Sequence, residues 1–427
     1  MTPSSLRSPV KAIVAIPGSK SITHRALIAA ALAKGESILK KALICDDTLL
    51  TIAALKQLGA SISISDARVG VTGTGGVFDR IPDRKEIYLG DSGTSYRLLL
   101  STAALAKGEF CLKGSSRMDK RPIADLVEAL KHLGVNAAFS KRNGFPPICV
   151  KANGIVGGRV SMAGDISSQY VSSILLASPY AQKDVEIRVG GKLASKPYVD
   201  LTIEVMERFG VKIIRDGYRH FKTRCGQRYK PRQFVVEGDL SSASYFWAAA
   251  AVTGGTVTTH NIRPMATRQG DIGLLEILQK MGCHIEKEND RVTVHGKELS
   301  GIEVDMSAMP DMVPTLAAVA LFAKGRTVIR NVAHLVHKES NRLKAVATEW
   351  RRVGGQVEEL QDGLVILGQR PLHGLTVKAH NDHRIAMSLA VIGLNVPDIK
   401  IAGEECVNKS FPGFWEKWNA LKNNKIE

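Results

Sequence analysis

The chain has 427 residues, of which 44% are hydrophobic and 23% are charged. This length predicts two or three domains with sizeable cores, and the composition excludes a largely disordered chain. Lysine and arginine exceed aspartate and glutamate by 17, which indicates anionic ligands; aromatic residues make up only 5%, which favours small phosphates and carboxylates over nucleic acid.

The sequence contains no stretch of about 18 apolar residues, and its first residues lack the apolar core of a signal peptide. We therefore expect a soluble, cytoplasmic protein without membrane contact. The cysteines form no CxxC pair and have no histidines at metal-ligand spacing. We expect reduced, mostly buried thiols at Cys45, Cys111, Cys149, Cys225, Cys283 and Cys406.

One sequence motif recurs along the chain. It consists of a helix-like stretch, a glycine, and then residues that alternate between apolar and polar. Its glycines are Gly59, Gly134, Gly210, Gly282 and Gly354, at steps of 75, 76, 72 and 72 residues. Each copy of this motif predicts a helix end, a left-handed glycine and a strand. A period of about 72 residues predicts about six α/β units, in a row or in two groups. The alternative is an ordinary α/β protein whose helices happen to end in glycine.

The first segment with candidate binding residues is IPGSKSITHR, in which a Pro17-Gly18 turn precedes a predicted helix. Lys20 and Ser21 stand at the helix start, where free N–H groups and the helix dipole favour an anion. Ser21 and Arg25 lie one turn apart on the same face. The segment predicts an anion site, and an ordinary capped helix is the alternative.

Two further helix starts carry similar residues. In YLGDSGTSYR, Gly93 belongs to a glycine-containing strand-to-helix turn, and Arg121 follows in SSRMDKRPI. In the third segment, Ser167, Ser168 and Gln169 begin a predicted helix. Neutral donors and cationic forks suit phosphate or carboxylate, whereas solvated charges and a plain Ser167 cap are the alternatives.

The second half of the chain adds acidic groups next to basic ones. Asp311 precedes an apolar helix, where desolvation or cations can tune it as a base, and capping that helix is its other possible role. Lys338, Glu339 and Arg342 have helical spacing, which predicts Lys338 and Arg342 on one helical face. Arg384 stands in HNDHR before an apolar helix, with too few ligands around it for a metal.

The motifs taken in order closely resemble the 5-enolpyruvylshikimate-3-phosphate synthase family. They are PGSKSxxxR, GxSGTxxR, RPI, SSQ, SxPY, GDxSSASY, PD before an apolar helix, KExxR, DHR and NKSFP, and they span about residues 11–418. The resemblance implies a two-domain α/β enolpyruvyl transferase fold, an inside-out α/β barrel of six βαβαββ units, three per domain. It implies domains 20–237 and 1–19 plus 238–427, with the active site in the interdomain cleft.

The resemblance also implies a reaction and its ligands. The family transfers the enolpyruvyl group of phosphoenolpyruvate to the 5-hydroxyl of shikimate 3-phosphate, releases phosphate and is inhibited by glyphosate. It implies no cofactor, no metal, no nucleic acid, and a monomer.

The resemblance assigns roles position by position. Asp311 corresponds to the base and Glu339 to the acid, while Lys20 and Lys409 assist catalysis. The residues that correspond to the shikimate 3-phosphate site are Lys20, Ser21, Arg25, Ser167, Ser168, Gln169, Ser195, Tyr198, Asp311 and Lys338. The residues that correspond to the phosphoenolpyruvate site are Lys20, Gly93, Arg121, Gln169, Arg342, Arg384 and Lys409.

Three positions depart from the family pattern. Asp91 replaces a common Asn, Asn341 replaces a usual Asp, and His334 stands where an Asn often contacts the shikimate side. We expect altered affinity rather than altered chemistry.

Two other functions remain open. The related UDP-N-acetylglucosamine enolpyruvyl transferases share the fold and donor but usually have a reactive loop cysteine. Cys111 lies in the corresponding region, although the residues around it alternate like a strand. The other alternative is a basic nucleic-acid-binding module, which the scarcity of aromatic residues disfavours.

Overall fold

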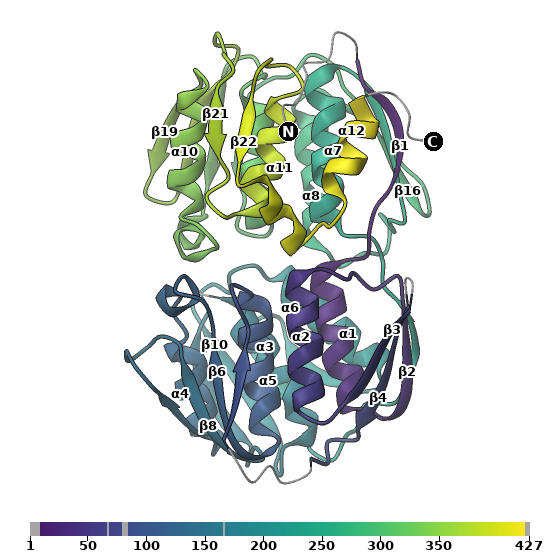
Figure 1. Ribbon diagram of the computed structural model, residues 1–427, viewed down its shortest axis with the longest axis vertical. Coiled ribbons are helices and arrows are strands. Elements are labelled where there is room, and N and C mark those ends of the chain that lie inside the picture. Colours follow the sequence, from purple (N-terminus) through teal and green to yellow (C-terminus); the bar gives the residue numbers. More distant parts are fainter. Residues whose placement is uncertain (1–8, 66–67, 79–83, 165–166, 423–427) are drawn as a thin grey trace. The chain divides into compact units, whose positions relative to one another are not determined.

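The computed structural model describes residues 9–65, 68–78, 84–164 and 167–422. The chain divides into two compact units, a continuous unit of Gly18–Val236 and a discontinuous unit of Met1–Pro17 with Glu237–Glu427 (Figure 1). The ends of the predicted discontinuous domain, residues 1–8 and 423–427, lie outside the described residues. No helix in the described ranges is long and apolar enough to cross a membrane.

The continuous unit contains three repeats, each with four strands in one sheet and two main helices. The first is β13 (Gln233–Val235), α1 (Lys20–Leu32), β2 (Lys34–Lys40), α2 (Asp46–Gln57), β3 (Ser61–Ser65) and β4 (Arg68–Thr74). The second is β5 (Lys85–Tyr88), α3 (Gly93–Ala104), β6 (Lys107–Lys113), η1 (Met118–Lys120), α4 (Ala124–His132), β7 (Asn136–Phe139) and β8 (Ile148–Asn153). The third is β9 (Gly158–Ala163), α5 (Ser168–Ala177), η2 (Ser178–Tyr180), β10 (Val185–Gly190), α6 (Pro197–Arg208), β11 (Ile213–Asp216) and β12 (His220–Thr223).

The discontinuous unit repeats the same plan. Its first repeat is β1 (Lys11–Ala15), α7 (Leu240–Thr253), β14 (Thr256–His260), η3 (Gly270–Ile272), α8 (Gly273–Lys280), β15 (His284–Lys287) and β16 (Arg291–His295). The second is β17 (Glu303–Asp305), η4 (Pro310–Met312), α9 (Val313–Ala320), β18 (Arg326–Arg330), η5 (Ala333–His337), α10 (Arg342–Arg352), β19 (Gln356–Leu360) and β20 (Gly363–Leu367). The third is β21 (Thr376–Lys378), α11 (His383–Ile392), β22 (Lys400–Ala402), η6 (Glu404–Lys409) and α12 (Phe414–Lys422).

The five four-stranded sheets of the described residues share one strand order, which confirms the predicted fold of repeated α/β units. Each has a parallel pair, as in β5 with β6, and adds two antiparallel strands to it. The last repeat differs from the prediction, since its described part has only the parallel pair β21–β22. The helix α12 follows instead of two strands, and its Phe414 and Trp418 rings pack against Phe246 of α7.

The units are interleaved in sequence because their first strands are exchanged. The N-terminal strand β1 pairs in parallel with β14 of the discontinuous unit, and the later strand β13 pairs in parallel with β2 of the continuous unit. The chain therefore passes from one unit to the other twice, after Pro17 and after Val236.

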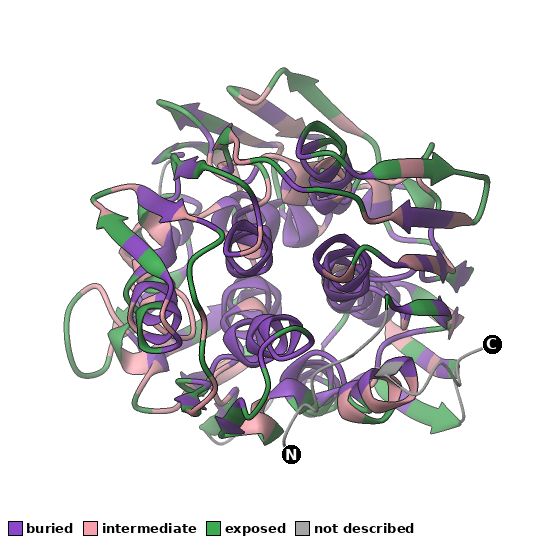
Figure 2. Cartoon of the chain, turned by 90° about the horizontal axis from the view of Figure 1, so that it is seen from above, coloured by how far each residue is buried: buried purple, intermediate pink, exposed green. Residues whose placement is uncertain are grey.

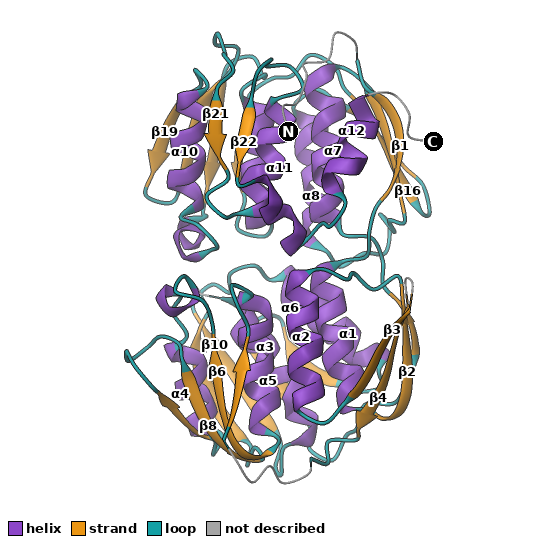
Figure 3. Cartoon of the chain, in the orientation of Figure 1, coloured by secondary structure: helices purple, strands orange, loops and turns teal. Residues whose placement is uncertain are grey.

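Within each unit the helices form the buried interior and the sheets lie outside them (Figure 3). Buried positions concentrate on the helices, whereas most exposed positions lie on strands and loops (Figure 2). Helix α7 is buried along almost its whole length. The repeated glycines Gly59, Gly134, Gly210, Gly282 and Gly354 have φ values from +84° to +124°, which confirms the predicted left-handed helix ends.

The prediction of six reduced cysteines is wrong for one pair, because Cys111 and Cys149 form a disulfide. Strands β6 and β8 are antiparallel and place these residues directly opposite each other. They are 38 residues apart in sequence, with α4 and β7 between them, so spacing alone did not reveal the pair. Cys45, Cys225, Cys283 and Cys406 are free thiols.

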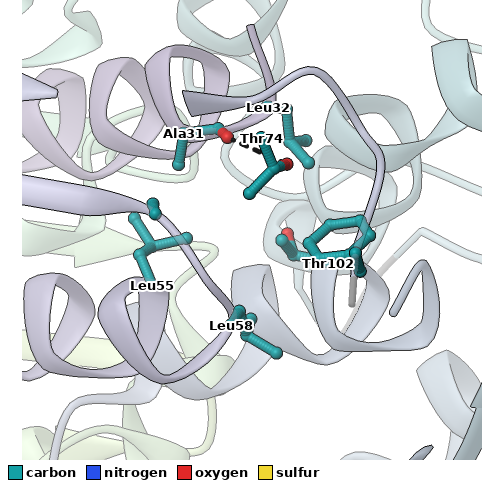
Figure 4. A pocket seen from close by; sticks show the side chains of 8 residues that line it. Ala31, Leu32, Leu55, Leu58, Thr74 and Thr102 are labelled. Atoms are coloured by element: carbon teal, nitrogen blue, oxygen red, sulfur yellow. Dashed lines mark hydrogen bonds between the residues drawn. The ribbon is translucent and has the colours of Figure 1, made fainter. Parts of the chain in front are cut away.

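A small apolar cavity of about 10 Å³ lies inside the continuous unit (Figure 4). Ala31 and Leu32, at the carboxyl end of α1, line it together with Leu55, Leu58 and Thr102. Thr74 lies beside it and donates to the Ala31 carbonyl. The cavity has room for about one water molecule, and the length of α1 separates it from Lys20 by roughly 17 Å. It is therefore a packing gap apart from the candidate site.

Candidate functional site

The candidate residues of the continuous unit gather where its helices begin. Lys20 is the first residue of α1, is 8% exposed, and donates to the carboxylate of Asp47 at a distance of 3.0 Å. Asp47 belongs to the first turn of α2, so this ion pair joins the starts of two helices. A buried lysine at a helix start adds its charge to the positive end of the helix dipole.

Arg25 is a buried cation that is held by neutral groups. Its guanidinium donates to the Thr202 hydroxyl at 2.7 Å, to the Ser21 carbonyl at 2.8 Å and to the Tyr198 carbonyl at 3.1 Å. No carboxylate of the described residues forms an ion pair with it. Burial lowers the pKa of Arg25 to about 10, so it is still charged at neutral pH. A buried charge without a counter-charge is costly, which makes this position suited to an anionic ligand.

Gln169 connects the starts of α3 and α5. Its side-chain carbonyl accepts from Arg97 at 2.8 Å, and its amide donates to the Thr94 hydroxyl at 3.1 Å. Ser167 caps α5 by accepting from the Gln169 backbone N–H at 3.3 Å, so its capping role is confirmed. The neighbouring Ser168 is buried in the first turn. These three predicted residues therefore lie together at one helix start.

Gly93 packs directly against the guanidinium of Arg121. A Cβ added at Gly93 would lie 2.6 Å from Nη1 of Arg121 and 2.7 Å from its Cζ. Arg121 also donates to the Asp91 carbonyl at 3.4 Å. The Asp91 carboxylate accepts from the Ser115 hydroxyl. The structure thus brings Gly93 and Arg121 together as one pair and gives the unusual Asp91 a neutral partner.

The predicted residues Ser195 and Tyr198 flank the start of α6. Ser195 is 8% exposed and has a φ of +53°. Tyr198 contributes its backbone carbonyl to Arg25. Tyr198 therefore joins the Arg25 cluster through a backbone hydrogen bond.

In the discontinuous unit, three cations surround Asp311. Its carboxylate lies 2.6 Å from Arg342 Nη1, 2.9 Å from Arg384 Nη2 and 3.3 Å from Lys338 Nζ. Burial raises the pKa of Asp311, but the three cations together lower it by more. The pKa of Asp311 is therefore well below its usual range. Asp311 is therefore an ionised carboxylate. It does not cap the following helix, whose N-cap residue is Met312.

Arg342 is the centre of this cluster. It is 1% exposed and also bonds Asp382 at 2.8 Å and Glu339 at 2.8 Å. Burial lowers the pKa of Arg342, but the surrounding carboxylates raise it more. For Asp382, burial raises the pKa of the carboxyl, but Arg342 lowers it by more, so the pKa lies below its usual value.

The prediction that Lys338 and Arg342 share a helical face is wrong. Helix α10 begins only at Arg342 because Asn341 is its N-cap, with its side chain accepting from the Lys344 N–H at 3.1 Å. Lys338 and Glu339 lie in the preceding turn. This departure from the family pattern, Asn341, therefore still caps a helix, and both turn residues still face the Asp311–Arg342 cluster.

Arg384 has further partners to which the sequence analysis assigned no role. It donates to the Ser241 hydroxyl at 3.2 Å and to the Tyr245 hydroxyl at 3.5 Å, both on α7. Ser241 in turn donates to the buried Asp271. Burial raises the pKa of Tyr245 to about 12, so its hydroxyl remains protonated.

The two remaining residues lie in short 3-10 helices of the same unit. Lys409 is 9% exposed at the end of η6, which packs against α11. His334 belongs to η5, and its Nε2 is buried without a hydrogen-bond partner among the described residues. Burial, and then Lys338, lower the pKa of His334 to about 4, so this departure from the family pattern is neutral at physiological pH.

Sequence reasoning missed the acids and hydroxyls that hold the cations. Asp47 and Asp271 look like ordinary acids near helix starts, and Ser241 looks like a first-turn serine. Ser241 and Asp382 stood in the quoted GDxSSASY and DHR motifs, but their contacts with Arg384 and Arg342 depend on the fold. No pattern in one sequence distinguishes such partners from caps.

Each unit thus has a basic cluster where helices begin, and one cluster surrounds an ionised carboxylate. This combination can bind small acidic ligands through charge-assisted hydrogen bonds and can accept a proton. The fold and the clusters define an enzyme for small acidic substrates.

Comparisons with known proteins identify its family. The model of the family described as EPSP synthase (3-phosphoshikimate 1-carboxyvinyltransferase) matches residues 5–418. Proteins named 3-phosphoshikimate 1-carboxyvinyltransferase from Shewanella baltica (strain OS155) and Methanoculleus marisnigri are 41% and 46% identical over 97% and 96% of this chain, and over 97% of each relative. The chain therefore belongs to the EPSP synthase family.

A solved structure supports the same family. The structure of EPSP synthase from Acinetobacter baumannii has a TM-score of 0.81 and 28% identity, and covers 98% of this chain and 97% of that chain. The two-domain α/β fold is therefore shared with a known member. Cys111, which the related transferases' reactive cysteine suggested as a candidate nucleophile, is instead a buried strand residue in a disulfide.

Proposed function

We propose that this protein transfers the carboxyvinyl group of phosphoenolpyruvate to the 5-hydroxyl of shikimate 3-phosphate and releases phosphate. The observation that carries this proposal is the Asp311 carboxylate, held ionised by Arg342, Arg384 and Lys338. A base among cations suits a reaction that deprotonates a hydroxyl next to an acidic donor.

The continuous unit supplies groups for the acidic acceptor. Arg25 and Lys20 are buried cations at the start of α1, and Ser168 and Gln169 add neutral donors at the start of α5. We assign the acceptor phosphate to these donors together with Ser21, Ser167, Ser195 and Tyr198, with Lys338 and Asp311 on the shikimate ring. Helix starts and guanidinium groups are the usual phosphate ligands.

The residues that we assign to the donor overlap with those of the acceptor and are mostly cations. We assign phosphoenolpyruvate to Arg121 beside Gly93, to Arg342 and Arg384, and to Lys20, Gln169 and Lys409. Binding this anion satisfies the arginines that now lower the pKa of Asp311. The carboxylate then becomes a stronger base at the time when a base is needed.

The reaction proceeds by addition and elimination. Asp311 accepts the proton of the 5-hydroxyl while the oxygen bonds to C2 of phosphoenolpyruvate. Glu339, in its protonated form, gives a proton to the methylene carbon, and a tetrahedral intermediate results. The bond from C2 to the phosphate oxygen then breaks, Lys409 assists the departing phosphate, and this phosphate takes up the proton from Asp311. The new methyl group returns its proton to Glu339 as the double bond re-forms. Atoms and charges balance without a cofactor.

Replacement of the base tests this assignment. Asp311→Asn keeps the shape of the side chain but removes its basicity, so we expect kcat to fall about a hundredfold or more while shikimate 3-phosphate still binds. The exposed Asp290→Asn serves as a control and should keep wild-type rates. A folded Asp311→Asn protein with near-normal kcat would remove Asp311 from the mechanism.

The same proposal covers three finer points. The protein acts as a monomer, works in the cytoplasm, and binds glyphosate at the phosphoenolpyruvate residues. The family membership and the cationic donor set support the inhibitor assignment. Light scattering of the purified chain, cell fractionation and competition of glyphosate against phosphoenolpyruvate test the three points in turn.

A further inference from the structure

Asp271 is a buried acid close to the Asp311 cluster, to which neither the resemblance nor the mechanism assigns a role. It lies in the short helix η3 and is 5% exposed. Its Oδ2 accepts from the Ser241 hydroxyl, and its Oδ1 has no hydrogen-bond partner among the described residues. No lysine or arginine in the described ranges forms a direct ion pair with it. Such a carboxyl is costly to bury, so its position calls for an explanation.

The groups around Asp271 make its charge sensitive to pH near neutrality. Burial raises the pKa of Asp271 to about 7, Arg384 of α11 lowers it, and the carboxylates of Asp311 in η4 and Asp239 at the start of α7 raise it. Ser241 contributes a hydrogen bond that lowers the pKa. The carboxyl is therefore a mixture of neutral and ionised forms at physiological pH.

A chain of hydrogen bonds connects Asp271 to Arg384. The Arg384 guanidinium donates to the Ser241 oxygen at 3.2 Å and to the Asp311 carboxylate at 2.9 Å. A hydroxyl has one proton, so Ser241 accepts from Arg384 while it donates to Asp271. Arg384 is thus held on one side by Asp311 directly and on the other by Asp271 through Ser241.

We propose that Asp271 is a positioning residue that acts through Ser241 to hold Arg384 in place for the carboxylate or phosphate of the donor substrate. This inference rests on the proposed function, since it takes Arg384 as a phosphoenolpyruvate ligand. When the donor binds, Arg384 shares its hydrogen bonds between Asp311 and the ligand. The hydrogen bonds through Ser241 to Asp271 then keep the guanidinium from rotating. A ligand that binds two of its N–H groups at once requires the guanidinium plane to be fixed.

The inference predicts a specific kinetic pattern. Asp271→Asn and Ser241→Ala should each raise KM for phosphoenolpyruvate about tenfold, change kcat less than threefold, and leave KM for shikimate 3-phosphate unchanged. The double variant should be no worse than either single variant, because both changes break one chain of bonds. Glu276→Gln, an exposed acid on the following helix α8, is the matched control.

The pH profile supplies a readout that a purely structural role would not change. We expect the ratio of KM between Asp271→Asn and wild type to be larger at pH 8 than at pH 6, with a midpoint near 7. Above that pH the wild-type carboxylate is ionised and accepts more strongly. Taking the ratio cancels the titration of the substrate itself.

The outcomes separate this inference from the proposed function. Phosphate release by the wild type, with KM in both single variants within twofold of wild type, would overturn the role of Asp271 and leave the function standing. Additive effects in the double variant, or a changed melting temperature with unchanged kinetics, would overturn it equally. Absence of wild-type turnover would overturn both. If Asp271→Asn does not fold, Ser241→Ala and its pH profile decide the question.

Discussion

Individual cations in both units are held in ways that leave them available to an acidic ligand. Arg25 has only neutral hydrogen-bond partners among those shown. Arg342 and Arg384, in contrast, share one carboxylate, that of Asp311. Arginine suits both situations because its planar guanidinium binds several acceptors at once. An anionic ligand therefore stabilises the site of Arg25 most, because Arg25 has no counter-charge among the partners shown. At Arg342 and Arg384, the ligand replaces part of the interaction with Asp311.

The contact between Gly93 and Arg121 predicts the effect of one added methyl group. In Gly93→Ala the new Cβ would overlap the end of a flexible side chain, so we expect Arg121 to shift and KM for phosphoenolpyruvate to rise about tenfold, or about 1.4 kcal/mol. Glyphosate is longer, so its inhibition constant should rise more. The melting temperature should stay within about 2 °C, since the backbone of Gly93 is not left-handed.

A matched glycine shows whether the position matters. Gly190 ends β10 of the same unit, and a Cβ there would meet nothing closer than 3.9 Å. Gly190→Ala should leave both constants unchanged. Equal constants in the Gly93 variant and wild type, with a folded protein, would show that Gly93 is not part of the donor site.

The raised pKa of Asp271 has a consequence for stability. In the unfolded chain the carboxyl titrates near 3.8, and in the folded protein near 7. Well below pH 3.8 it is protonated in both states, and as the pH rises towards 7 the unfolded chain releases the proton while most folded molecules keep it. The free energy of unfolding therefore falls over this range, by up to about 4 kcal/mol.

Substitution of Asp271 should remove this decrease in the free energy of unfolding with rising pH. We expect the melting temperature of Asp271→Asn, relative to wild type, to increase between pH 5 and pH 8. Calorimetry of both proteins at a series of pH values measures the difference. A difference that stays constant or decreases with pH would contradict the assignment.

At the scale of elements, one buried acid fixes the turn that leads to Asp382 and Arg384. Glu349 of α10 is 1% exposed and accepts from Arg352 at 2.6 Å, from His380 at 2.8 Å and from the Lys378 N–H at 3.1 Å. His380 and its neighbour Asn381 have φ values of +55° and +53°. Two consecutive left-handed residues other than glycine are unfavourable, so the turn depends on bonds such as these.

Loss of Glu349 should therefore destabilise the protein and disturb the donor site. Glu349→Ala should lower the free energy of unfolding by about 1 to 3 kcal/mol and raise KM for phosphoenolpyruvate, because Asp382 and Arg384 follow the turn. Chemical denaturation and steady-state kinetics measure the two effects. The exposed Glu358→Ala on β19 is the control, with a change within about 0.5 kcal/mol; a similarly small change for Glu349→Ala would show that the turn does not need this acid.

The elements were more predictable from the sequence than the contacts between them. Glycines such as Gly59 and Gly134 have a recurrent local signature, so the helix ends and the repeat followed from spacing. The helix starts bearing Lys20, Gln169 and Arg384 were also local. The start of α10 was misplaced, because Asn341 is a weaker signal than the helical spacing of Lys338 and Arg342.

At the scale of the whole molecule, the features that the sequence did not predict depend on pairs of residues or strands that are distant in sequence. The ion pair between Arg342 and Asp382 spans 40 residues, and the disulfide of Cys111 with Cys149 spans 38. The exchange of β1 and β13 between units likewise has no local signal. Such pairs are set by strand order and helix packing, which a single sequence does not state.

The net charge of +17 belongs to the same scale. It attracts anions in general, and the buried cations at helix starts convert this general attraction into sites for particular ligands. Charge alone therefore does not distinguish an acceptor such as shikimate 3-phosphate from UDP-N-acetylglucosamine or from nucleic acid.

The most direct test of the central claim is phosphate release from phosphoenolpyruvate with each acceptor. With shikimate 3-phosphate we expect one phosphate per acceptor consumed, together with the carboxyvinyl ether product in the mass spectrum. With UDP-N-acetylglucosamine, and without any acceptor, we expect no release above background. Turnover of UDP-N-acetylglucosamine, or no phosphate from shikimate 3-phosphate with folded protein, would contradict the account.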